Sequence, residues 1–314
     1  MPKLNVQQNN QNVIQAFKNA LAIGNLKGII ASDGSHNFST AGSNRNLLDN
    51  PWWGSGEVVN QRNTQSTPSN GSYTIDRWIL TSGADANQWA IDANGITFTI
   101  ASSSIWYTQR TANPSAWSGK TLTASVLLSD GTIKSGSAAF TYGTAVTFYN
   151  DSAINLSMNT SGQFVLAIRS TQTIRAVKLE LGPVSTLAND APPKESQVTD
   201  DCKWYFQRIQ QEDGYTAPVG FGIVASSTTI LRTLIPLSSP LRKAGTLTAT
   251  ATNIGQMRVQ GNGSNLTPTA ITGRGVLNGH AVVDITVNGT LASNQFYTLV
   301  FANSSATIDL SKDL

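Results

Sequence analysis

The chain has 314 residues, of which only 12% are charged, and its formal net charge is +3. Because about 150 residues make an ordinary domain, this length allows two hydrophobic cores. No run of Lys or Arg is longer than two residues, so the sequence lacks the basic cluster that a nucleic-acid-binding surface requires.

Asn, Ser, Thr and Gly take the place of the missing charged residues, and this composition favours strands and turns over helices. The single cysteine, Cys202, excludes an intrachain disulfide and is expected to be a small buried hydrophobic residue rather than a nucleophile. The first residues lack an apolar signal core, and no run of 18 apolar residues occurs. We therefore expect synthesis in the cytoplasm and no membrane insertion.

Residues 7–23 form the best predicted helix. Val13, Phe17 and Leu21 recur on one apolar stripe, while Asn, Gln and Lys cover the other side. This stripe either packs on its own domain or mediates self-association or docking to a larger assembly. Residues 24–46 are rich in Gly, Ser and Asn, which predicts a linker or extended arm.

From residue 46 to about residue 182 the sequence predicts short strands separated by turns. The stretch "TLTASVLLSDGTIKSG" predicts a β-hairpin that turns at Asp130-Gly131. In "TIRAVKLELG", Val177, Leu179 and Leu181 are expected to point to one side, while Lys178 and Glu180 are expected to face outward. Many short strands at close spacing indicate a β-sandwich or jelly roll.

A change of pattern after residue 182 predicts a domain boundary. Gly182-Pro183 ends the last strand, and Pro192-Pro193 makes an extended connector. A short helix is predicted within residues 196–209, with Cys202, Phe206 and Ile209 on one face. A second, smaller β-sandwich follows, in which Val283, Ile285 and Val287 share one face, as do Tyr297, Leu299 and Phe301. The predicted organisation is a mainly β chain: helix and arm (1–45), sandwich (46–190), linker with short helix (191–212) and second sandwich (213–314).

Residues for catalysis or metal binding are not apparent. The two histidines, His36 and His280, have no Cys, Asp or second His at metal-ligand spacing. We therefore expect no catalytic residue, no metal site and no cofactor. A glycosidase needs only two carboxylates, so a polysaccharide-degrading enzyme stays as a minor alternative.

Tryptophan is concentrated in the predicted first sandwich, which holds six of the seven in the chain. Flat aromatic side chains with polar neighbours suit sugar rings and their hydroxyl groups. Trp78 is expected in the core. Trp106, Tyr107 and Trp117, with Arg110 and Asn113 beside them, are the candidates for an exposed glycan-binding platform, although a place in the core or in a subunit interface is an alternative. Trp52 and Trp53 point to opposite faces if extended, so one of them is expected to be exposed or covered by a partner.

Several motifs in order resemble a module pair of tailed-bacteriophage structural proteins. These motifs are "NLLDNPWW" with "VVNQR", then "YTIDRW", then "AVKLELGPVSTLANDAPP" leading into "CKWYFQRI", and the ending "FANSSATIDLSKDL". The resemblance covers most of residues 46–314. It implies a carbohydrate-binding-module-like jelly roll followed by a second β domain, in a tail-fibre or receptor-binding type of virion protein.

The resemblance also implies a homotrimer that attaches to other virion proteins through its N-terminal segment. Val13, Phe17 and Leu21 are then the candidates for the attachment site or trimer interface. The leading hypothesis is a non-enzymatic virion fibre that contacts host cell-surface glycan. The second is a purely structural head-fibre, baseplate or capsid-decoration component, and the third is a polysaccharide depolymerase. None of the three involves nucleic-acid binding.

Overall fold

The computed structural model describes residues 30–32, 38–40, 44–62, 70–82, 88–101, 104–211, 217–225, 227–241 and 246–312. The chain divides into two compact units, one of residues 1–45 and 186–190 and the other of residues 46–185 and 191–314. In the first unit, β1 (Ile30–Ser32) and β2 (Phe38–Thr40) pair antiparallel, and residues Leu187–Asn189 form a short 3-10 turn, η2. Part of the predicted arm is therefore a strand pair. The predicted helix with Val13, Phe17 and Leu21 lies outside the described residues.

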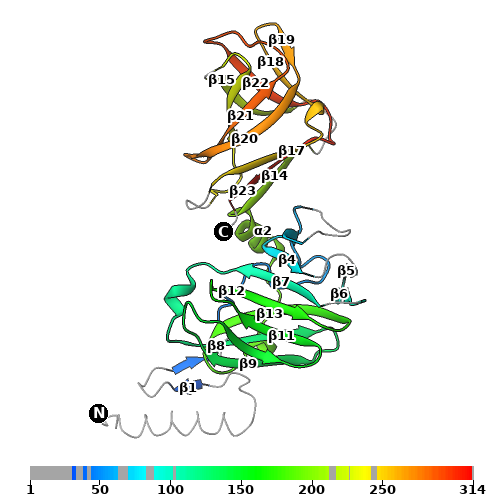
Figure 1. Cartoon of the computed structure of the whole chain (residues 1–314), viewed down its shortest axis with the longest axis vertical. Helices are drawn as coiled ribbons and strands as arrows, with labels where there is room; N and C mark the ends of the chain where they lie inside the picture. The colour runs from blue at the N-terminus through cyan, green and yellow to red at the C-terminus, as the bar shows by residue number, and fades with distance from the viewer. Residues whose placement is uncertain are drawn as a thin grey trace, which may run out of the picture. The chain divides into compact units, whose positions relative to one another are not determined.

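The second unit is mainly β and begins with two antiparallel sheets that face each other as in a β-sandwich (Figure 1). The six-stranded sheet has the order β10-β11-β12-β7-β4-β3, and the five-stranded sheet has the order β5-β6-β13-β8-β9. The strands of the six-stranded sheet are β3 (Ser72–Ile75), β4 (Trp78–Ser82), β7 (Ile105–Arg110), β10 (Val146–Asn150), β11 (Ile154–Met158) and β12 (Gln163–Ile168). Those of the five-stranded sheet are β5 (Gln88–Asp92), β6 (Gly95–Thr99), β8 (Thr121–Leu128), β9 (Ile133–Ala139) and β13 (Gln172–Leu181).

An aromatic cluster forms the centre of this first sandwich. The rings of Trp53 and Trp78 meet edge to face with centroids 5.0 Å apart, and Phe98, Tyr107 and Phe164 surround them. The indole N–H groups of both tryptophans donate to the backbone carbonyl oxygen of Asn50, so neither buried indole lacks an acceptor. Trp78 is fully buried, as expected. Truncating such a side chain typically costs ~3–5 kcal/mol of stability.

The expectation that Trp52 or Trp53 needs exposure or a partner is wrong. Both side chains are buried, because residues 47–53 run along β13 like an additional strand. The backbone N–H of Trp53 donates to the carbonyl of Arg175, and that of Val177 donates to the carbonyl of Pro51. Trp53 faces the core, whereas Trp52 lies on the other side, with the Arg175 guanidinium 5.9 Å from its ring centroid.

The predicted hairpin at Asp130-Gly131 is confirmed. Strands β8 and β9 pair from Thr121 with Ala139 to Leu127 with Ile133. Gly131 has a φ of +84°, a left-handed conformation that glycine adopts without strain. The Asp130 carboxylate accepts a hydrogen bond from the backbone N–H of Thr132 and closes the turn.

The alternation in β13 is confirmed for Val177 and Leu179, which enter the core. Leu181, at the end of the strand, is 42% exposed and lies outside the core. The expected exposure of the polar residues is wrong, since Lys178 and Glu180 face away from the core and yet are fully buried. Lys178 Nζ lies 3.6 Å from Glu180 Oε2. A buried ion pair of this kind is tolerated because each charge compensates the other.

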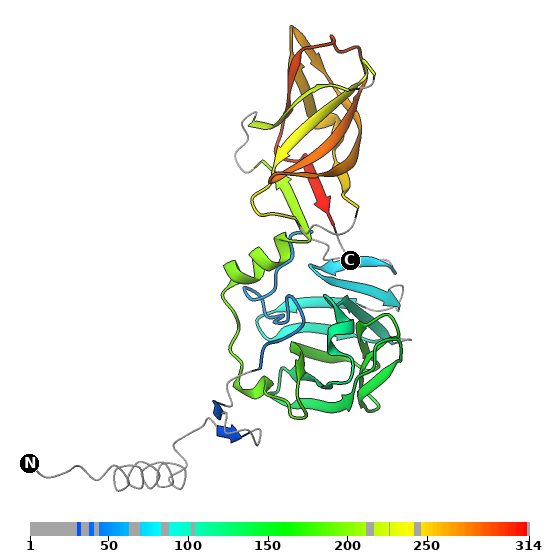
Figure 2. The ribbon, with the colours of Figure 1, turned by 90° about the vertical axis from the view of Figure 1, so that its left-hand side faces the viewer.

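The rest of the second unit holds a seven-stranded sheet of order β19-β18-β22-β15-β16-β21-β20 and a three-stranded sheet of order β14-β23-β17 (Figure 2). The strands of the larger sheet are β15 (Ala217–Val224), β16 (Ile230–Pro236), β18 (Met257–Gly261), β19 (Ser264–Leu266), β20 (Pro268–Leu277), β21 (His280–Val287) and β22 (Phe296–Phe301). Those of the smaller sheet are β14 (Phe206–Gln210), β17 (Thr248–Thr252) and β23 (Thr307–Ser311). One hydrophobic core draws on both sheets, which is consistent with a second sandwich. Short 3-10 turns occur at η1 (Pro114–Trp117) and η3 (Ile254–Gln256).

Both predicted core faces of this second sandwich are confirmed. Val283, Ile285 and Val287 on β21 are buried in its core. Tyr297, Leu299 and Phe301 on β22 are buried in the same core. The period-2 pattern was sufficient here because only one side of each strand contacts the core.

The predicted linker helix is shorter than expected. Helix α2 spans Glu195–Lys203, and Cys202 is buried on it together with Val198. Phe206 and Ile209 belong instead to β14, which pairs with β23 along its whole length. Figure 2 shows α2 leading directly into this strand. The aromatic run Trp204–Phe206 favours an extended chain, and pairing with β23 decides the conformation.

Candidate functional site

The outer face of the six-stranded sheet carries the most exposed aromatic side chain of the first sandwich's described strands. Along β7 the residues alternate, so that Ile105 and Tyr107 enter the core while Trp106 and Arg110 face outward. Trp106 is 48% exposed. An indole on a sheet face presents a flat apolar surface with its polar N–H at one edge.

Small and polar residues surround Trp106 on the neighbouring strands. Ala167 on β12 lies directly across from Trp106, and Asn155 on β11 lies across from Ala167. The Asn155 side-chain amide donates to Asn150 Oδ1, which also accepts from the Arg169 guanidinium. Polar groups held in this way lie about 10 Å from the indole, at two strand spacings. We call this surface, with Trp106, Arg110, Gln163, Ala167 and Asn155, the Trp106 face.

A groove of about 350 Å³ lies at the Arg110 end of this face. Its walls include Arg110 and Gln163, which are direct cross-strand neighbours, and Tyr142, which is 48% exposed. Pro114 and Ser161 also line this groove, which we call the Arg110 groove. Arg110 comes four positions after Trp106 on the extended strand, so their backbones are about 13 Å apart.

Local hydrogen bonds fix the shape of the Arg110 groove. Asn159 Oδ1 accepts from the backbone N–H of Ser161 and of Gln163, and the Asn159 amide donates to Gln163 Oε1. Gly162, at a φ of +76°, packs so closely on the Pro114 ring that a Cβ atom there would collide with it. The groove is therefore formed by a tight turn against a short 3-10 helix, and its form is preset.

The guanidinium of Arg110 makes no ion pair with any residue that the structure describes. The Arg77 guanidinium, by contrast, donates hydrogen bonds to the carbonyl of Arg110 and to the Asp49 carboxylate. It also stacks on the Tyr205 ring, 3.5 Å from the ring centroid. Arg110 is thus an exposed donor of up to five hydrogen bonds beside a phenol ring and an amide. This set of groups can contact a sugar ring through the aromatic side chain and its hydroxyls through the donors.

The structure brings only some of the five predicted glycan-binding residues together. Trp106 and Arg110 share one strand face, as described. Asn113 is exposed and precedes the 3-10 turn whose Pro114 lines the groove, and its side-chain oxygen accepts from Ser115. Trp117 is half-buried against the core.

The prediction that Tyr107 belongs to an exposed glycan-binding platform is wrong, because Tyr107 is buried in the core. Its side chain is 1% exposed and its ring centroid lies 5.2 Å from that of Phe98. Burial raises the pKa of its phenol. Because neighbouring residues on a strand face opposite sides, Trp106 and Tyr107 cannot both be exposed.

Tyr142, Ser161 and Gln163 of the groove were not predicted from the sequence. Tyr142 and Ser161 lie in the turns that follow β9 and β11, and Gln163 begins β12, so only the tertiary fold brings them to the end of β7. Tyr142 in "FTYG" is an aromatic residue directly before a turn glycine, which is the one signal that could have indicated an exposed ring.

No family model, no curated protein and no solved structure matches this chain. The site must therefore be judged on its own chemistry. Among the described residues there is no group of three or more His, Cys, Asp or Glu side chains that could hold a metal ion. His280 is a half-buried side chain beside the carbonyl of Asn278, and His36 lies outside the described residues. No helix in the described ranges has both the length and the apolar character to cross a bilayer.

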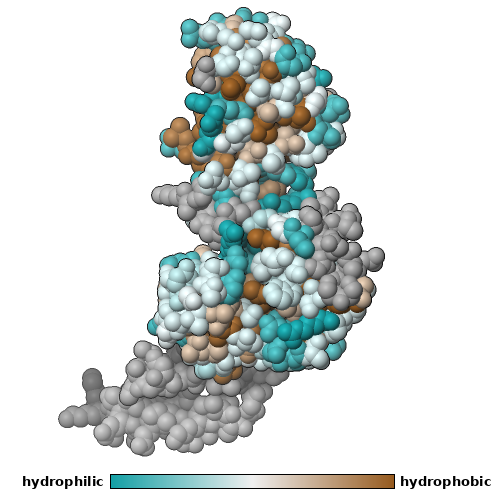
Figure 3. All heavy atoms as spheres, in the orientation of Figure 1, coloured by the Kyte–Doolittle hydropathy of each residue, from teal (hydrophilic) through white to brown (hydrophobic). Residues whose placement is uncertain are grey.

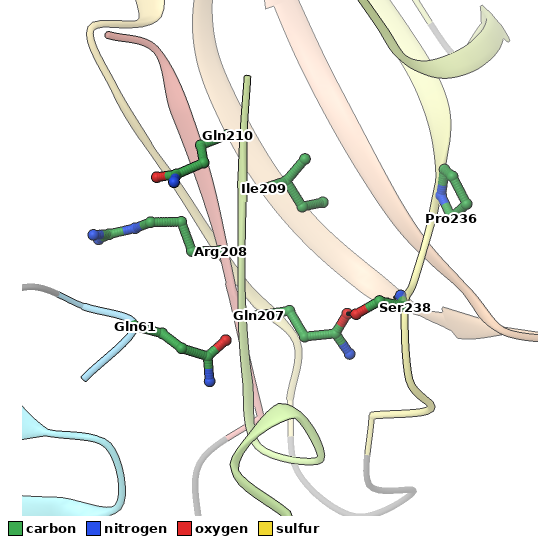
Figure 4. Close-up of a pocket in the computed structure, with 7 residues that line it drawn as sticks. All are labelled: Gln61, Gln207, Arg208, Ile209, Gln210, Pro236 and Ser238. Carbon is green, nitrogen blue, oxygen red and sulfur yellow. Dashed lines mark hydrogen bonds between the residues drawn. The ribbon is translucent and has the colours of Figure 1, made fainter. Parts of the chain in front are cut away.

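A second cleft, of about 400 Å³, is lined by β14 and its surroundings (Figure 4). Arg208 makes two hydrogen bonds of 2.7 Å to the Asp309 carboxylate, which raise the pKa of the guanidinium despite its partial burial. Gln207 donates to the carbonyl of Ser239 and accepts from Ser238, toward which it points in Figure 4. The main polar groups of this cleft are engaged within the chain, so they fix β14 in place and offer little to a ligand.

Proposed function

We propose that this protein is a non-enzymatic structural protein of a bacteriophage virion, a fibre that contacts host cell-surface glycan through the Trp106 face and the Arg110 groove. In this proposal the first sandwich is a carbohydrate-binding-module-like jelly roll and the chain works as a homotrimer. Its N-terminal segment, with Val13, Phe17 and Leu21, attaches to other virion proteins. The ordered motifs between residues 46 and 314 support the phage assignment.

One observation carries the glycan part of the proposal. A half-exposed indole and an exposed arginine without an ion-pair partner among the described residues lie on one strand face, next to a preformed groove with a tyrosine. Exposing such side chains without a ligand costs hydrophobic free energy, since burial of a large aromatic contributes about 1.5–3 kcal/mol. Sugar rings offer the apolar faces and hydroxyl groups that this surface matches.

The groove residues include no carboxylate. Hydrolysis of a glycosidic bond needs a carboxyl pair at the bound sugar, so the same surface favours binding over cleavage. A purely structural virion component stays as the second candidate function, supported by the exposed apolar sheet face of the second sandwich described below.

A glycan array with the full-length chain tests the proposal. We expect binding to a surface polysaccharide of the host, and a loss of about tenfold or more in affinity for Trp106→Ala and Arg110→Ala, because each removes one contact of about 1.4 kcal/mol. Trp204→Ala is the matched control, since Trp204 is 53% exposed but lies at the end of α2. A wild-type chain that binds no glycan would favour the structural candidate, and unchanged binding by both site variants would move the site elsewhere.

A further inference from the structure

The seven-stranded sheet of the second sandwich exposes apolar side chains on the face opposite its core. Phe221, Ile223, Leu234, Leu277 and Phe296 are each between 42% and 79% exposed, and we call this surface the apolar face. On β15 and β16 these residues alternate with Gly222, Leu231, Thr233 and Ile235, which are buried. An antiparallel sheet with one face in water normally carries polar residues there, so this pattern needs an explanation.

Register places most of the apolar face in two adjacent rows. Phe296 lies across from Ile223, and Phe221 lies across from Leu234, which in turn lies across from Val282. The rows therefore run over four neighbouring strands in the interior of the sheet, away from its end strand β19. The space-filling view shows hydrophobic residues, in brown, among the hydrophilic ones on the surface of the second sandwich (Figure 3).

The apolar face has both a protrusion and a hollow. Phe296 is 79% exposed, the largest exposed fraction among the large hydrophobic residues described. Beside it is a groove of about 430 Å³ whose walls include Ile223, Leu234 and Leu277. The Phe296 side chain of a second copy can enter this groove, while the groove of that second copy receives the side chain of a third. A head-to-tail contact of this kind closes into a ring, as a trimer requires.

The size of the surface also fits association of like chains. Two phenylalanines and three aliphatic side chains at these exposures leave on the order of 500 Å² of apolar surface. That is at the upper end of what a monomer usually exposes in one patch. With a polar margin it approaches the ~800 Å² per partner that a stable interface buries.

The charges at the margin of the apolar face are mostly paired within the chain. Asp284 accepts from Arg232 at 2.9 Å and from Arg274 at 2.7 Å, so this group of three side chains carries a net charge of only +1. The like-charge repulsion between copies that meet here is therefore that of one net charge on each copy. A nucleic-acid or acidic partner would instead require unpaired cations at this place.

We propose that the apolar face is the surface through which copies of this chain associate, with the Phe296 side chain of one copy seated in the groove of another. The proposal deepens the trimeric fibre proposed above and rests on it for the number of copies. It moves the main contact between copies from the N-terminal segment to the second sandwich.

The test is the molar mass of the full-length chain by size exclusion with light scattering, combined with sedimentation over a wide concentration range. We expect a trimer for the wild type and a shift to monomer for Phe296→Asp and, independently, for Leu277→Lys, with association weakened at least about tenfold. Trp106→Ala is the control and should assemble like the wild type. A wild-type monomer, or variants that are folded by circular dichroism and still assemble, would overturn the proposal.

A second measurement keeps the test decisive if either charged variant fails to fold. In Phe296→Cys, a short bifunctional maleimide should link copies of the chain, and Trp204→Cys should not be linked. Absence of linkage at position 296 in an assembled protein would contradict the interface. A wild-type dimer lost in Phe296→Asp would support this interface while contradicting the trimer. The proposed glycan binding is tested separately: a monomeric Phe296→Asp variant should still bind glycan, with the affinity of a single site. Loss of assembly and loss of glycan binding can therefore be told apart.

Discussion

Asp151 shows how a single acid can organise a turn of the first sandwich. Its carboxylate accepts from Lys134 Nζ at 2.6 Å, from the Tyr149 hydroxyl at 2.8 Å and from the backbone N–H groups of Ala153 and Ile154. Partial burial raises the pKa of the carboxyl, but the hydrogen bonds outweigh it and hold the pKa well below its usual range. This one residue therefore links β9, β10 and the start of β11.

We expect Asp151→Asn to lower the free energy of unfolding by about 1–3 kcal/mol at neutral pH, because a charged acceptor of several hydrogen bonds is lost. The folded pKa is lower than the unfolded value of about 3.9, so this contribution is present above pH 4 and is lost as the pH falls through the folded pKa. Urea denaturation at several pH values measures it. The gap between wild type and variant should shrink in acid, whereas a constant gap would contradict the role of the charge.

Asp130→Asn provides the control for this experiment. Asp130 is also an acid in a turn, but its side chain is exposed and its carboxylate accepts chiefly from the N–H of Thr132. We expect a clearly smaller effect on stability at every pH. An equal effect of the two substitutions would mean that the Lys134 and Tyr149 contacts contribute little.

At the scale of elements, one glycine brings two sheets together at their edges. Gly136 lies in β9, at the end of the five-stranded sheet, and faces the backbone of β10, at the end of the six-stranded sheet. A Cβ atom at this position would collide with the carbonyl oxygen of Phe148. The φ of Gly136 is not in the left-handed region, so the backbone conformation does not require glycine here. The close approach of the two strands does.

Gly136→Ala should therefore destabilise the protein by about 1–3 kcal/mol, the usual cost of overpacking. Gly275→Ala on β20 is the matched control, because nothing lies within 4 Å of a Cβ atom added there. We expect the control to stay within about 0.5 kcal/mol of the wild type. Thermal unfolding followed by circular dichroism measures both, and equal midpoints for the two variants would contradict the close-approach argument.

Many strands of the chain could be predicted because residues on one side of a strand face the core while those on the other side do not. The hairpin at Asp130 and the core positions Val283 and Tyr297 follow from local alternation and turn residues. Trp52 could not be placed in this way, because its own segment runs along β13, which follows it by more than a hundred residues in the sequence. Phe206 was misassigned to a helix since its pairing with β23 is invisible locally.

The candidate site was predictable to the same extent. The outward direction of Trp106 and Arg110 follows from their spacing on one strand, and that spacing also requires Tyr107 to be buried. The place of Tyr142 and Gln163 in the groove was not predictable. It depends on how the turn after β9 and the start of β12 meet the end of β7 in the fold. Domain boundaries near residues 45, 190 and 212 stay a prediction, and so does the N-terminal helix.

At the scale of the whole molecule, assembly and stability should be coupled. If copies associate through the apolar face, the folded chain gains free energy from its partners, and this gain rises with protein concentration. The thermal midpoint should therefore increase with concentration for the wild type and stay constant for Phe296→Asp. Differential scanning calorimetry at several concentrations measures this, and a constant wild-type midpoint would contradict the coupling.

The buried thiol on α2 has a practical consequence for imaging. Cys202 is the single cysteine of the chain, its side chain is fully enclosed, and burial raises the pKa of the thiol well above its ordinary value. A native preparation should thus be nearly silent toward maleimide reagents. A cysteine added to either sandwich can then carry a gold cluster or a fluorophore without removal of Cys202. On the virion proposed above, such a label would report which way the protein points.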